Sequence, residues 1–393
     1  MIENICPEEK CTGCFACMNV CPTECIRIIS DDEGFFRPEI ITENCNGCSA
    51  CIKVCPMLNL SKPNPFIVPK VYACWNIDDE IRFESASGGV FTALAHTVLK
   101  NNGVVFGAAF DKKMYLKHIS VSRFEELGVL RSSKYVQSYI GNCFGEIRRI
   151  LKQGKRVLFS GTPCQVHALK TYLRKEYELF FTCDMLCHGV PSPGLFAQYI
   201  AQLQKQFKGK LVNINMRHKL KGWKKLFYTV ALLRDGQECV LTGLSDSFMH
   251  GFLSGISLRP SCYLCPYTNT DRYGDITLAD FWGIGDLVPF HHDTRKGVSL
   301  ILVNSEKGKK LFEQSVCQMF FEERSLEEAV YKRPKLTHPF PRPQIREAFF
   351  SDYQQIEYEK LARRYLVDKG MKGFIKQIVP KEWIFKLHNM IRK

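Results

Sequence analysis

The sequence predicts an α/β (α+β) protein, in which a small cysteine-rich N-terminal domain precedes a mixed-sheet α/β domain and a helical, basic C-terminal tail. Three observations predict this arrangement: a cysteine run that occurs twice in the first 60 residues, a proline-rich stretch directly after it, and alternating strand and helix patterns from residue 71 onward. The 393 residues are enough for two or three domains with a buried core.

The two cysteine runs indicate an internal duplication. Residues 11–22 read CTGCFACMNVCP and residues 45–56 read CNGCSACIKVCP, with eight of the twelve positions identical. Each run is C-x2-C-x2-C-x3-C-P, the ligand pattern of bacterial ferredoxins that hold two 4Fe–4S clusters. Three close thiolates wrap one cubane, and the fourth ligates the other cluster. The predicted ligands are Cys11, Cys14, Cys17 and Cys55 for the first cluster, and Cys45, Cys48, Cys51 and Cys21 for the second.

Other readings of the cysteines are less consistent with the sequence. The chain has 19 cysteines, an odd number, and from its first residues we expect no export signal, which together argue against a disulfide framework. Zinc knuckles are the alternative for the two runs, but zinc sites usually place two C-x2-C pairs well apart. Cys6 and Cys25 lie outside the ligand pattern and are expected to be bystanders.

Charge is distributed unevenly along a chain whose formal net charge is +14. Residues 1–60 hold four Lys and Arg against nine Asp and Glu, whereas residues 360–393 hold ten against two. Such a basic balance can indicate nucleic acid, an acidic partner or a phosphate-bearing cofactor. No nucleic-acid motif, Walker A run or GxGxxG is present, so we expect no nucleic-acid partner.

Four prolines between residues 56 and 69 predict an extended linker over 61–70. Beyond it, we expect strands at 71–74, 104–110, 156–160 and 179–187, and helices at 90–99 and 142–153. Residues 226–234 and 238–241 flank Asp235-Gly236 and predict an antiparallel hairpin. The last 50 residues have a helical pattern.

Four further cysteines lie on loops near the ends of these strands. Cys164 follows the strand at 156–160, Cys187 ends the next strand, and Cys262 and Cys265 form a C-x2-C pair downstream. Four cysteines from three loops could close one tetrahedral site. Spacing alone does not distinguish zinc from iron–sulfur, or a metal site from unrelated thiols.

Six stretches of the body carry a family resemblance. They are SASGGVFTAL (85–94), SKYVQSYIG (133–141), VLFSGTPCQVHALK (157–170), CHGVPSP (187–193), MRHKLKGW (216–223) and CYLCPYTNTDRYGDITLADFWGIGD (262–286). In this order they resemble the coenzyme F420 hydrogenase/dehydrogenase beta subunits. The resemblance implies a flavoprotein that binds FAD and holds an additional 4Fe–4S cluster, whose ligands here would be Cys164, Cys187, Cys262 and Cys265.

With this resemblance, the expected domains are a two-cluster ferredoxin-type domain (1–60), the linker (61–70), a flavin-binding catalytic domain with the third cluster (71–300) and a helical basic region (301–393). The expected flavin contacts are Ser85, Ser87, Gly88, Gly89, Thr92, Lys134, Gly161 and Thr162. A small-residue turn at a helix N-terminus suits a diphosphate, and a lysine could stabilise reduced flavin. Alternatively, Ser87 is only an N-cap and Lys134 a solvated surface lysine.

Candidate catalytic residues are fewer. His188 could donate a proton, and Arg217 and Lys219 could face the substrate, although they could equally belong to an ordinary basic loop. We therefore expect an iron–sulfur flavoprotein oxidoreductase that passes electrons between a ferredoxin or another redox protein, the clusters and FAD. Hydride would move to or from a small organic substrate or a deazaflavin.

Two alternatives come from other functional classes. One is an electron-transfer subunit of a larger redox complex that has no organic substrate of its own, and the other is a scaffold protein whose metal is structural. No run of 18 apolar residues is present, so the expected location is cytoplasmic. Aromatic and aliphatic residues alternate with Lys and Arg after Lys360, which could place the tail on the inner face of a membrane or on the body of the protein.

Overall fold

The computed structural model describes residues 4–61, 63, 68–224, 228–242 and 245–367. Its strands are β1 Ile26–Ser30, β2 Phe36–Ile40, β3 Lys70–Asn76, β4 Val104–Phe110, β5 Leu116–Val121, β6 Val157–Ser160, β7 Phe180–Met185, β8 Leu211–His218, β9 Tyr228–Leu233, β10 Glu238–Thr242, β11 Ile276–Asp280, β12 Ser299–Val303 and β13 Met319–Arg324.

Helices connect most of these strands. The α-helices are α1 Ala16–Val20, α2 Ala50–Val54, α3 Asp79–Glu84, α4 Val90–Lys100, α5 Cys143–Lys152, α6 Pro163–Leu173, α7 Pro193–Phe207, α8 Ser247–Leu253, α9 Glu306–Ser315, α10 Leu326–Val330, α11 Arg346–Tyr353 and α12 Tyr358–Tyr365. The 3-10 helices are η1 Thr42–Asn44, η2 Phe124–Leu130, η3 Pro260–Leu264, η4 Val316–Gln318 and η5 Pro334–Leu336.

The predicted mixed sheet is confirmed, and it has eight strands in the order β13-β3-β12-β11-β7-β6-β4-β5. The central strands β11, β7, β6 and β4 pair in parallel, and the outer strands pair antiparallel. Parallel strands require crossover connections, which α6 and α5 supply here. Because β6 and β7 are parallel neighbours, the loops that follow them leave the sheet at the same edge.

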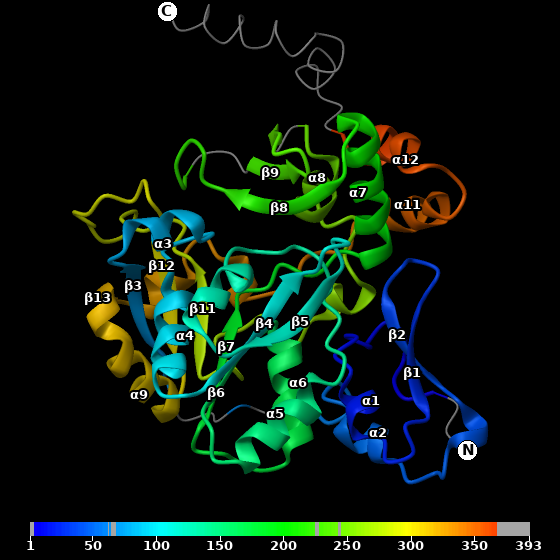
Figure 1. The fold of residues 1–393 in the computed structure, drawn as a ribbon, viewed down its shortest axis with the longest axis horizontal. Helices are drawn as coiled ribbons and strands as arrows, with labels where there is room; N and C mark the ends of the chain where they lie inside the picture. The colour runs from blue at the N-terminus through cyan, green and yellow to red at the C-terminus, as the bar shows by residue number, and fades with distance from the viewer. Residues whose placement is uncertain (1–3, 62, 64–67, 225–227, 243–244, 368–393) are drawn as a thin grey trace, which may run out of the picture.

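Side chains alternate between the two faces of the sheet, as the period of a strand requires. On β6, Leu158 packs with α4 and α9, whereas Val157 and Phe159 pack with α5 and α6. Phe15 and Phe36 of the cysteine-rich domain join this second cluster. The N-terminal domain therefore lies against the α5–α6 face, where α1 and α2 contact α6 (Figure 1).

A separate layer covers the edge of the sheet where β6 and β7 end (Figure 1). Its antiparallel sheet has the order β10-β9-β8, and helices α7, α8, α11 and α12 pack with it in one core. The predicted hairpin corresponds to β9 and β10, which pair with Glu238 opposite Leu232. Sequence patterns did not indicate the third strand, β8.

The C-terminal part of the chain differs from the expectation of a purely helical region after residue 300. The expected boundary falls inside β12, which pairs antiparallel with β3, and β13 adds a further strand on the other side of β3. The main sheet therefore continues to Arg324. Residues 368–393, where most of the proposed membrane-contacting tail lies, are outside the described residues. No helix in the described part of the chain is long and apolar enough to cross a membrane.

A buried carboxylate ties three segments of this sheet together. Asp275 is 1% exposed, and its oxygens accept hydrogen bonds from the Thr182 amide (2.8 Å), the Thr182 hydroxyl (2.6 Å) and the Ser305 hydroxyl (2.7 Å). Burial by itself would raise the pKa of Asp275, but Lys170 and Lys307 and these hydrogen bonds hold that pKa below its ordinary value.

We expect Asp275→Ala to lower the free energy of unfolding by about 3 kcal/mol, because it leaves buried donors without an acceptor. The matched control Asp286→Ala removes an exposed carboxylate that pairs with Lys332, and should cost less than about 1 kcal/mol. Urea unfolding followed by circular dichroism measures both. The difference between Asp275→Ala and wild type should shrink as the pH falls below about 4, since protonation then removes the same charge. Equal losses in the two variants would contradict this role.

Candidate functional site

The two cysteine runs of the N-terminal domain adopt the same local conformation. Phe15 and Ser49, directly before α1 and α2, have left-handed backbones with φ of 66° and 58°. Gly13 and Gly47 have φ of 61° and 72°. Glycine reaches this region at no steric cost, whereas the two L-residues adopt it under local constraint. The repeated tight turns direct successive cysteines of each run toward one side.

The predicted ligands of the first cluster line one cavity of about 390 Å³. They are Cys11, Cys14, Cys17 and Cys55. Cys55 comes from the second run, so the structure brings the two runs together in the crossed arrangement that the spacing indicates. We call this cavity and its cysteines the first head centre. Cys6 also lines it, and a hydrogen bond from the Cys6 thiol lowers the pKa of Cys55 to about 6.

We call the four predicted ligands of the second cluster the second head centre. They are Cys21, Cys45, Cys48 and Cys51. Burial raises the pKa of Cys51, and the nearby Cys21 and Cys48 thiols raise it further. The Cys25 sulfur lies 3.4 Å from that of Cys21. Cys48 is exposed, so this centre lies at the protein surface.

The third set of cysteines is positioned by the ends of β6 and β7. After β6, Gly161 and Thr162 lead into α6, where Thr162 forms a capping box with Gln165. Cys164 follows Pro163 in the first turn of that helix. Cys187 lies in the loop between β7 and α7. A bridge between Pro191 and Leu258 brings η3, which holds Cys262 and ends before Cys265, to the same edge.

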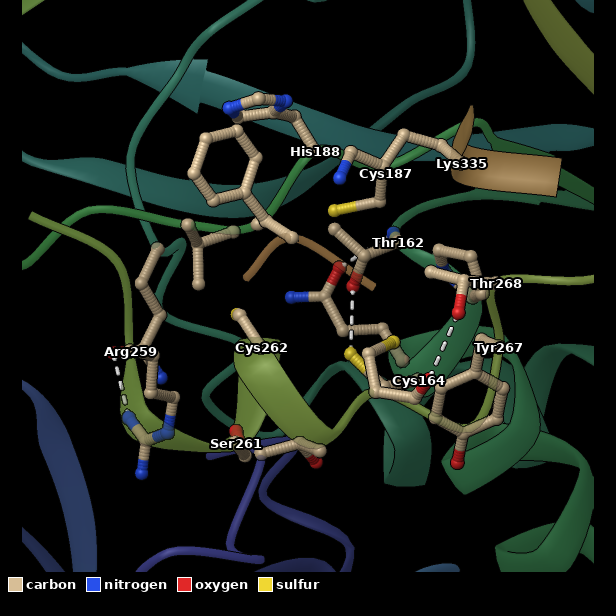
Figure 2. Close-up of a pocket in the computed structure, with 18 of the residues that line it drawn as sticks. Thr162, Cys164, Cys187, His188, Arg259, Ser261, Cys262, Tyr267, Thr268 and Lys335 are labelled. Atoms are coloured by element: carbon tan, nitrogen blue, oxygen red, sulfur yellow. Dashed lines mark hydrogen bonds between the residues drawn. The ribbon is translucent and has the colours of Figure 1, made fainter. Parts of the chain in front are cut away.

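All four of these cysteines line one cavity of about 690 Å³, which we call the body centre. Figure 2 shows Cys164, Cys187 and Cys262 around it, with Arg259 and Lys335 on opposite sides of the view. Burial raises the pKa of the Cys164, Cys187 and Cys265 thiols to about 11. Burial therefore disfavours the thiolate form of these cysteines. A bound metal would supply positive charge and favour the thiolate form instead.

The donor sets suit iron–sulfur clusters. Thiolates are the ligands of such clusters, and the first head centre and the body centre each place four cysteines around an open volume. Within the described residues, no group of three or more His, Cys, Asp or Glu side chains is arranged to hold a metal ion. No Asp or Glu among the described residues lines the body cavity.

The first head centre and the body centre are neighbours. Thr12 lines both cavities. The fully buried Arg259 lines the body cavity, and its guanidinium donates from Nε to the Cys11 carbonyl (2.6 Å) and from Nη2 to the Cys11 sulfur (3.7 Å). Tyr267 also lines the body cavity, and its hydroxyl contacts the sulfur of Met57, a residue of the head cavity, at 3.8 Å.

The expected flavin turn lies between α3 and α4 and is partly occupied by its own packing. The Ser85 and Ser87 hydroxyls donate to the carbonyls of Ile81 (2.8 Å) and Val298 (2.9 Å). A Cβ on Gly88 would lie 2.5 Å from the Cys74 carbonyl oxygen, so this glycine allows close packing on β3. Gly89 has a φ of 81° and caps α4. The Thr92 hydroxyl is buried and has no hydrogen-bond partner among the described residues, which suits an absent ligand.

Lys134 is partly buried, not the solvated lysine of the alternative reading. Its ammonium donates to the carbonyls of Arg131 (2.7 Å) and Ser132 (3.3 Å), and burial lowers its pKa to about 7. Arg131 pairs with Glu84, which brings this loop close to the flavin turn. Gly161 packs against the Phe159 ring, and the Thr162 hydroxyl lies 3.1 Å from the Cys164 sulfur.

The three candidate catalytic residues occupy different surroundings. Burial lowers the pKa of His188 to about 4, and its ring lines the body cavity with Nε2 on the Phe252 carbonyl (3.1 Å). Arg217 is 1% exposed and lies 3.9 Å from Asp280. Lys219 donates to three backbone carbonyls, those of Arg82, Ser87 (2.7 Å) and Lys296 (2.8 Å), so it holds the flavin turn in place.

Sequence reasoning missed several residues of the site. Arg259 stands three residues before Cys262, and this position next to the C-x2-C pair could have identified it as a residue of the site. Lys335 and Phe340 line the body cavity from the C-terminal region, far from any motif, and no local pattern indicates them. Arg82 lies beside the flavin turn, is 5% exposed and donates hydrogen bonds to the Gly297 carbonyl. The charged residues around Arg82 in the sequence predict an exposed side chain instead.

Two family models match parts of this chain. The model of the 4Fe–4S dicluster domain matches residues 10–58. The model of the C-terminal part of the coenzyme F420 hydrogenase/dehydrogenase beta subunits matches residues 154–329. The first range contains the eight head cysteines and the second contains the four body cysteines.

Two further comparisons used whole proteins. A chain in the structure of the F420-reducing NiFe hydrogenase complex from Methanosarcina barkeri is 15% identical, with a TM-score of 0.46, over 77% of this chain and 95% of that one. The search of curated proteins gave no match. The dicluster match identifies an iron–sulfur protein of electron transfer. The chain is similar over residues 154–329 to the C-terminal part of the coenzyme F420 hydrogenase/dehydrogenase beta subunits, and over residues 10–58 to the 4Fe–4S dicluster domain.

Proposed function

We propose that this protein is an iron–sulfur flavoprotein oxidoreductase that passes electrons between a ferredoxin-type donor, three 4Fe–4S clusters and FAD. Hydride would be transferred to or from a small organic substrate or a deazaflavin. The observation that carries the proposal is the shared wall of the two cavities, where Thr12 lines both the first head centre and the body centre. The thiol-lined cavity of the N-terminal domain thus adjoins the one at the edge of the main sheet, and Cys48 of the second head centre is exposed.

Iron–sulfur clusters carry single electrons, and a flavin exchanges both single electrons and hydrides. Cys164, Cys187, Cys262 and Cys265 would hold the body cluster, and α6, the β7–α7 loop and η3 fix their positions. Lys335 extends into the same cavity, where burial lowers its pKa and the Cys187, Cys265 and Cys262 thiolates oppose that change. Its positive charge would stabilise a negatively charged cluster.

Buried cations beside the flavin turn support an anionic dinucleotide there. Arg82, Arg217 and Lys219 are 5%, 1% and 3% exposed, and Lys134 lies in the adjoining loop. Burial lowers the pKa of Arg82 to about 10, and the Asp79 and Asp293 carboxylates oppose that change. An FAD pyrophosphate would add further negative charge beside this group. The Thr92 hydroxyl would gain the partner that it lacks within the described residues.

The exposed side of the head is the natural entry for electrons. Cys48 of the second head centre is exposed, and the surrounding N-terminal domain is acidic, with nine Asp and Glu against four Lys and Arg in residues 1–60. A redox protein that docks there would need a complementary surface near this centre. Contact with such a partner protein would fit both the proposed enzyme and an electron-transfer subunit without a substrate of its own.

Anaerobic purification with iron, sulfide and flavin quantification tests the cofactor content. Wild-type protein should contain about twelve irons and one FAD per chain. The double variant Cys187→Ala/Cys265→Ala removes two ligands of the body cluster and should retain about eight irons.

The matched control for this double variant is Cys183→Ala, which removes a buried thiol from β7, four residues before Cys187. It should retain about twelve irons. About eight irons without flavin in wild-type protein would reject the body cluster and leave only the head. Twelve irons without flavin would favour the electron-transfer subunit.

Lys134→Met tests the flavin site. Loss of a charged donor beside an anionic cofactor should weaken FAD binding about tenfold or more, measured by fluorescence titration of the flavin-stripped protein. The affinity of wild-type protein should fall as the pH rises through about 7, since Lys134 then loses its charge. Lys134→Met should weaken this pH dependence without abolishing it, because Lys219 beside the flavin turn also has a pKa lowered to about 7, whereas the neighbouring His118 has a pKa of about 4 and stays neutral.

The control for the flavin test is Lys117→Met, which removes a half-exposed lysine of β5 that lies 3.8 Å from Asp111. Its FAD affinity should equal that of wild type at every pH. If the two lysine variants bind FAD equally well, Lys134 has no role in the flavin site.

A further inference from the structure

We propose that Arg259 is a counter-cation shared by the first head centre and the body centre, and that it raises the reduction potentials of both. The proposal rests on the body cluster of the proposed function. It assigns Arg259 a positioning and tuning role, acting through the cysteines of two domains rather than on a substrate.

The backbone of Arg259 contacts a cysteine of the body centre, and its side chain contacts a cysteine of the first head centre. Its backbone carbonyl accepts a hydrogen bond from the Cys262 amide at 2.9 Å, at the start of η3. Its side chain lines the body cavity and reaches the other domain, where Nε and Nη2 contact the carbonyl and sulfur of Cys11 at 2.6 Å and 3.7 Å. Arg259 therefore lines the body cavity, as Figure 2 shows, and also contacts Cys11 of the head cavity.

The charge of Arg259 has no carboxylate partner among the described residues. The side chain is fully buried, and its remaining acceptors are neutral: the Phe36 carbonyl (3.0 Å) and the Gln137 side-chain oxygen (3.1 Å). A buried guanidinium is costly unless an anion compensates it. The cysteine sets on either side are the groups that would supply this negative charge when they hold clusters.

A cation between two clusters has a predictable electrostatic effect. A cubane with four thiolates is negatively charged, and reduction adds one more negative charge, so a nearby cation favours the reduced form. A hydrogen bond to a ligand sulfur acts in the same direction. The contacts of Arg259 reach the first head centre and the body centre, and none of them involves Cys21, Cys45, Cys48 or Cys51.

Redox titration of the holoprotein, monitored by electron paramagnetic resonance, tests the proposal. Arg259→Met should make the potentials of the first head centre and the body centre more negative and leave that of the second head centre unchanged. Comparison with the Cys187→Ala/Cys265→Ala variant assigns the body-centre signal, because that variant lacks the body cluster.

The matched control is Arg346→Met, which removes another buried arginine of the same domain interface. Arg346 is 1% exposed and forms an ion pair with Glu33, so its charge is already balanced. The control should destabilise the interface while leaving all three potentials near those of wild type. If Arg259→Met does not retain its clusters, Arg259→Gln provides the same test, because glutamine is neutral but keeps a polar end for the buried acceptors. The potential of the first head centre should then fall.

Unchanged potentials at both centres in a fully loaded Arg259 variant would overturn the proposal, and so would an equal shift at all three centres. The iron content separates this failure from that of the proposed function. Wild-type protein with about eight irons rejects the body cluster. The potential of the first head centre in Arg259→Met then decides by itself whether Arg259 tunes that centre.

Discussion

The contact between the N-terminal domain and the body is the interaction on which the whole site depends. Phe15 and Phe36 pack edge to face on Tyr139 at ring distances of 4.9 and 5.5 Å, and their core is continuous with that of α5 and α6. Arg259 and Arg346 add charged hydrogen bonds across the same boundary. Without this contact, the head cavity and the body cavity would share no wall, and the head would be a separate electron carrier.

The parallel centre of the sheet provides the second constraint. Neighbouring parallel strands end at one edge, so residues that lie 23 positions apart in the sequence, such as Cys164 and Cys187, can line one cavity. The Thr162 capping box and the N-cap of Ser192 fix where the two following helices begin. The thiols are thus held in place by helix ends and strand ends, which are among the more rigid parts of a loop-built site.

Sequence reasoning succeeded where the information was local. The duplicated spacing predicts which head cysteines share a centre, and one of the two predicted sets, Cys11, Cys14, Cys17 and Cys55, lines one cavity. The strands of the body could be located because continuous apolar runs mark buried parallel strands. The four body cysteines were assigned to one centre through a family resemblance, since they come from three loops. The partial burial of Lys134, the position of Lys335 and the pairing of β13 with β3 depend on contacts between distant segments, and no local pattern encodes them.

The distribution of charge links folding to cofactor binding. In the absence of metal, burial keeps the thiols of the body centre protonated, so Arg259 and Lys335 have no anion beside them. On the proposed function, binding of a cluster would replace those protons with a net negative charge that both cations can stabilise. The same cations that are unfavourable beside neutral thiols would then favour the bound cluster. Because Arg259 also contacts Cys11 of the N-terminal domain, cluster binding would stabilise the domain interface, and a stable interface would in turn favour cluster binding.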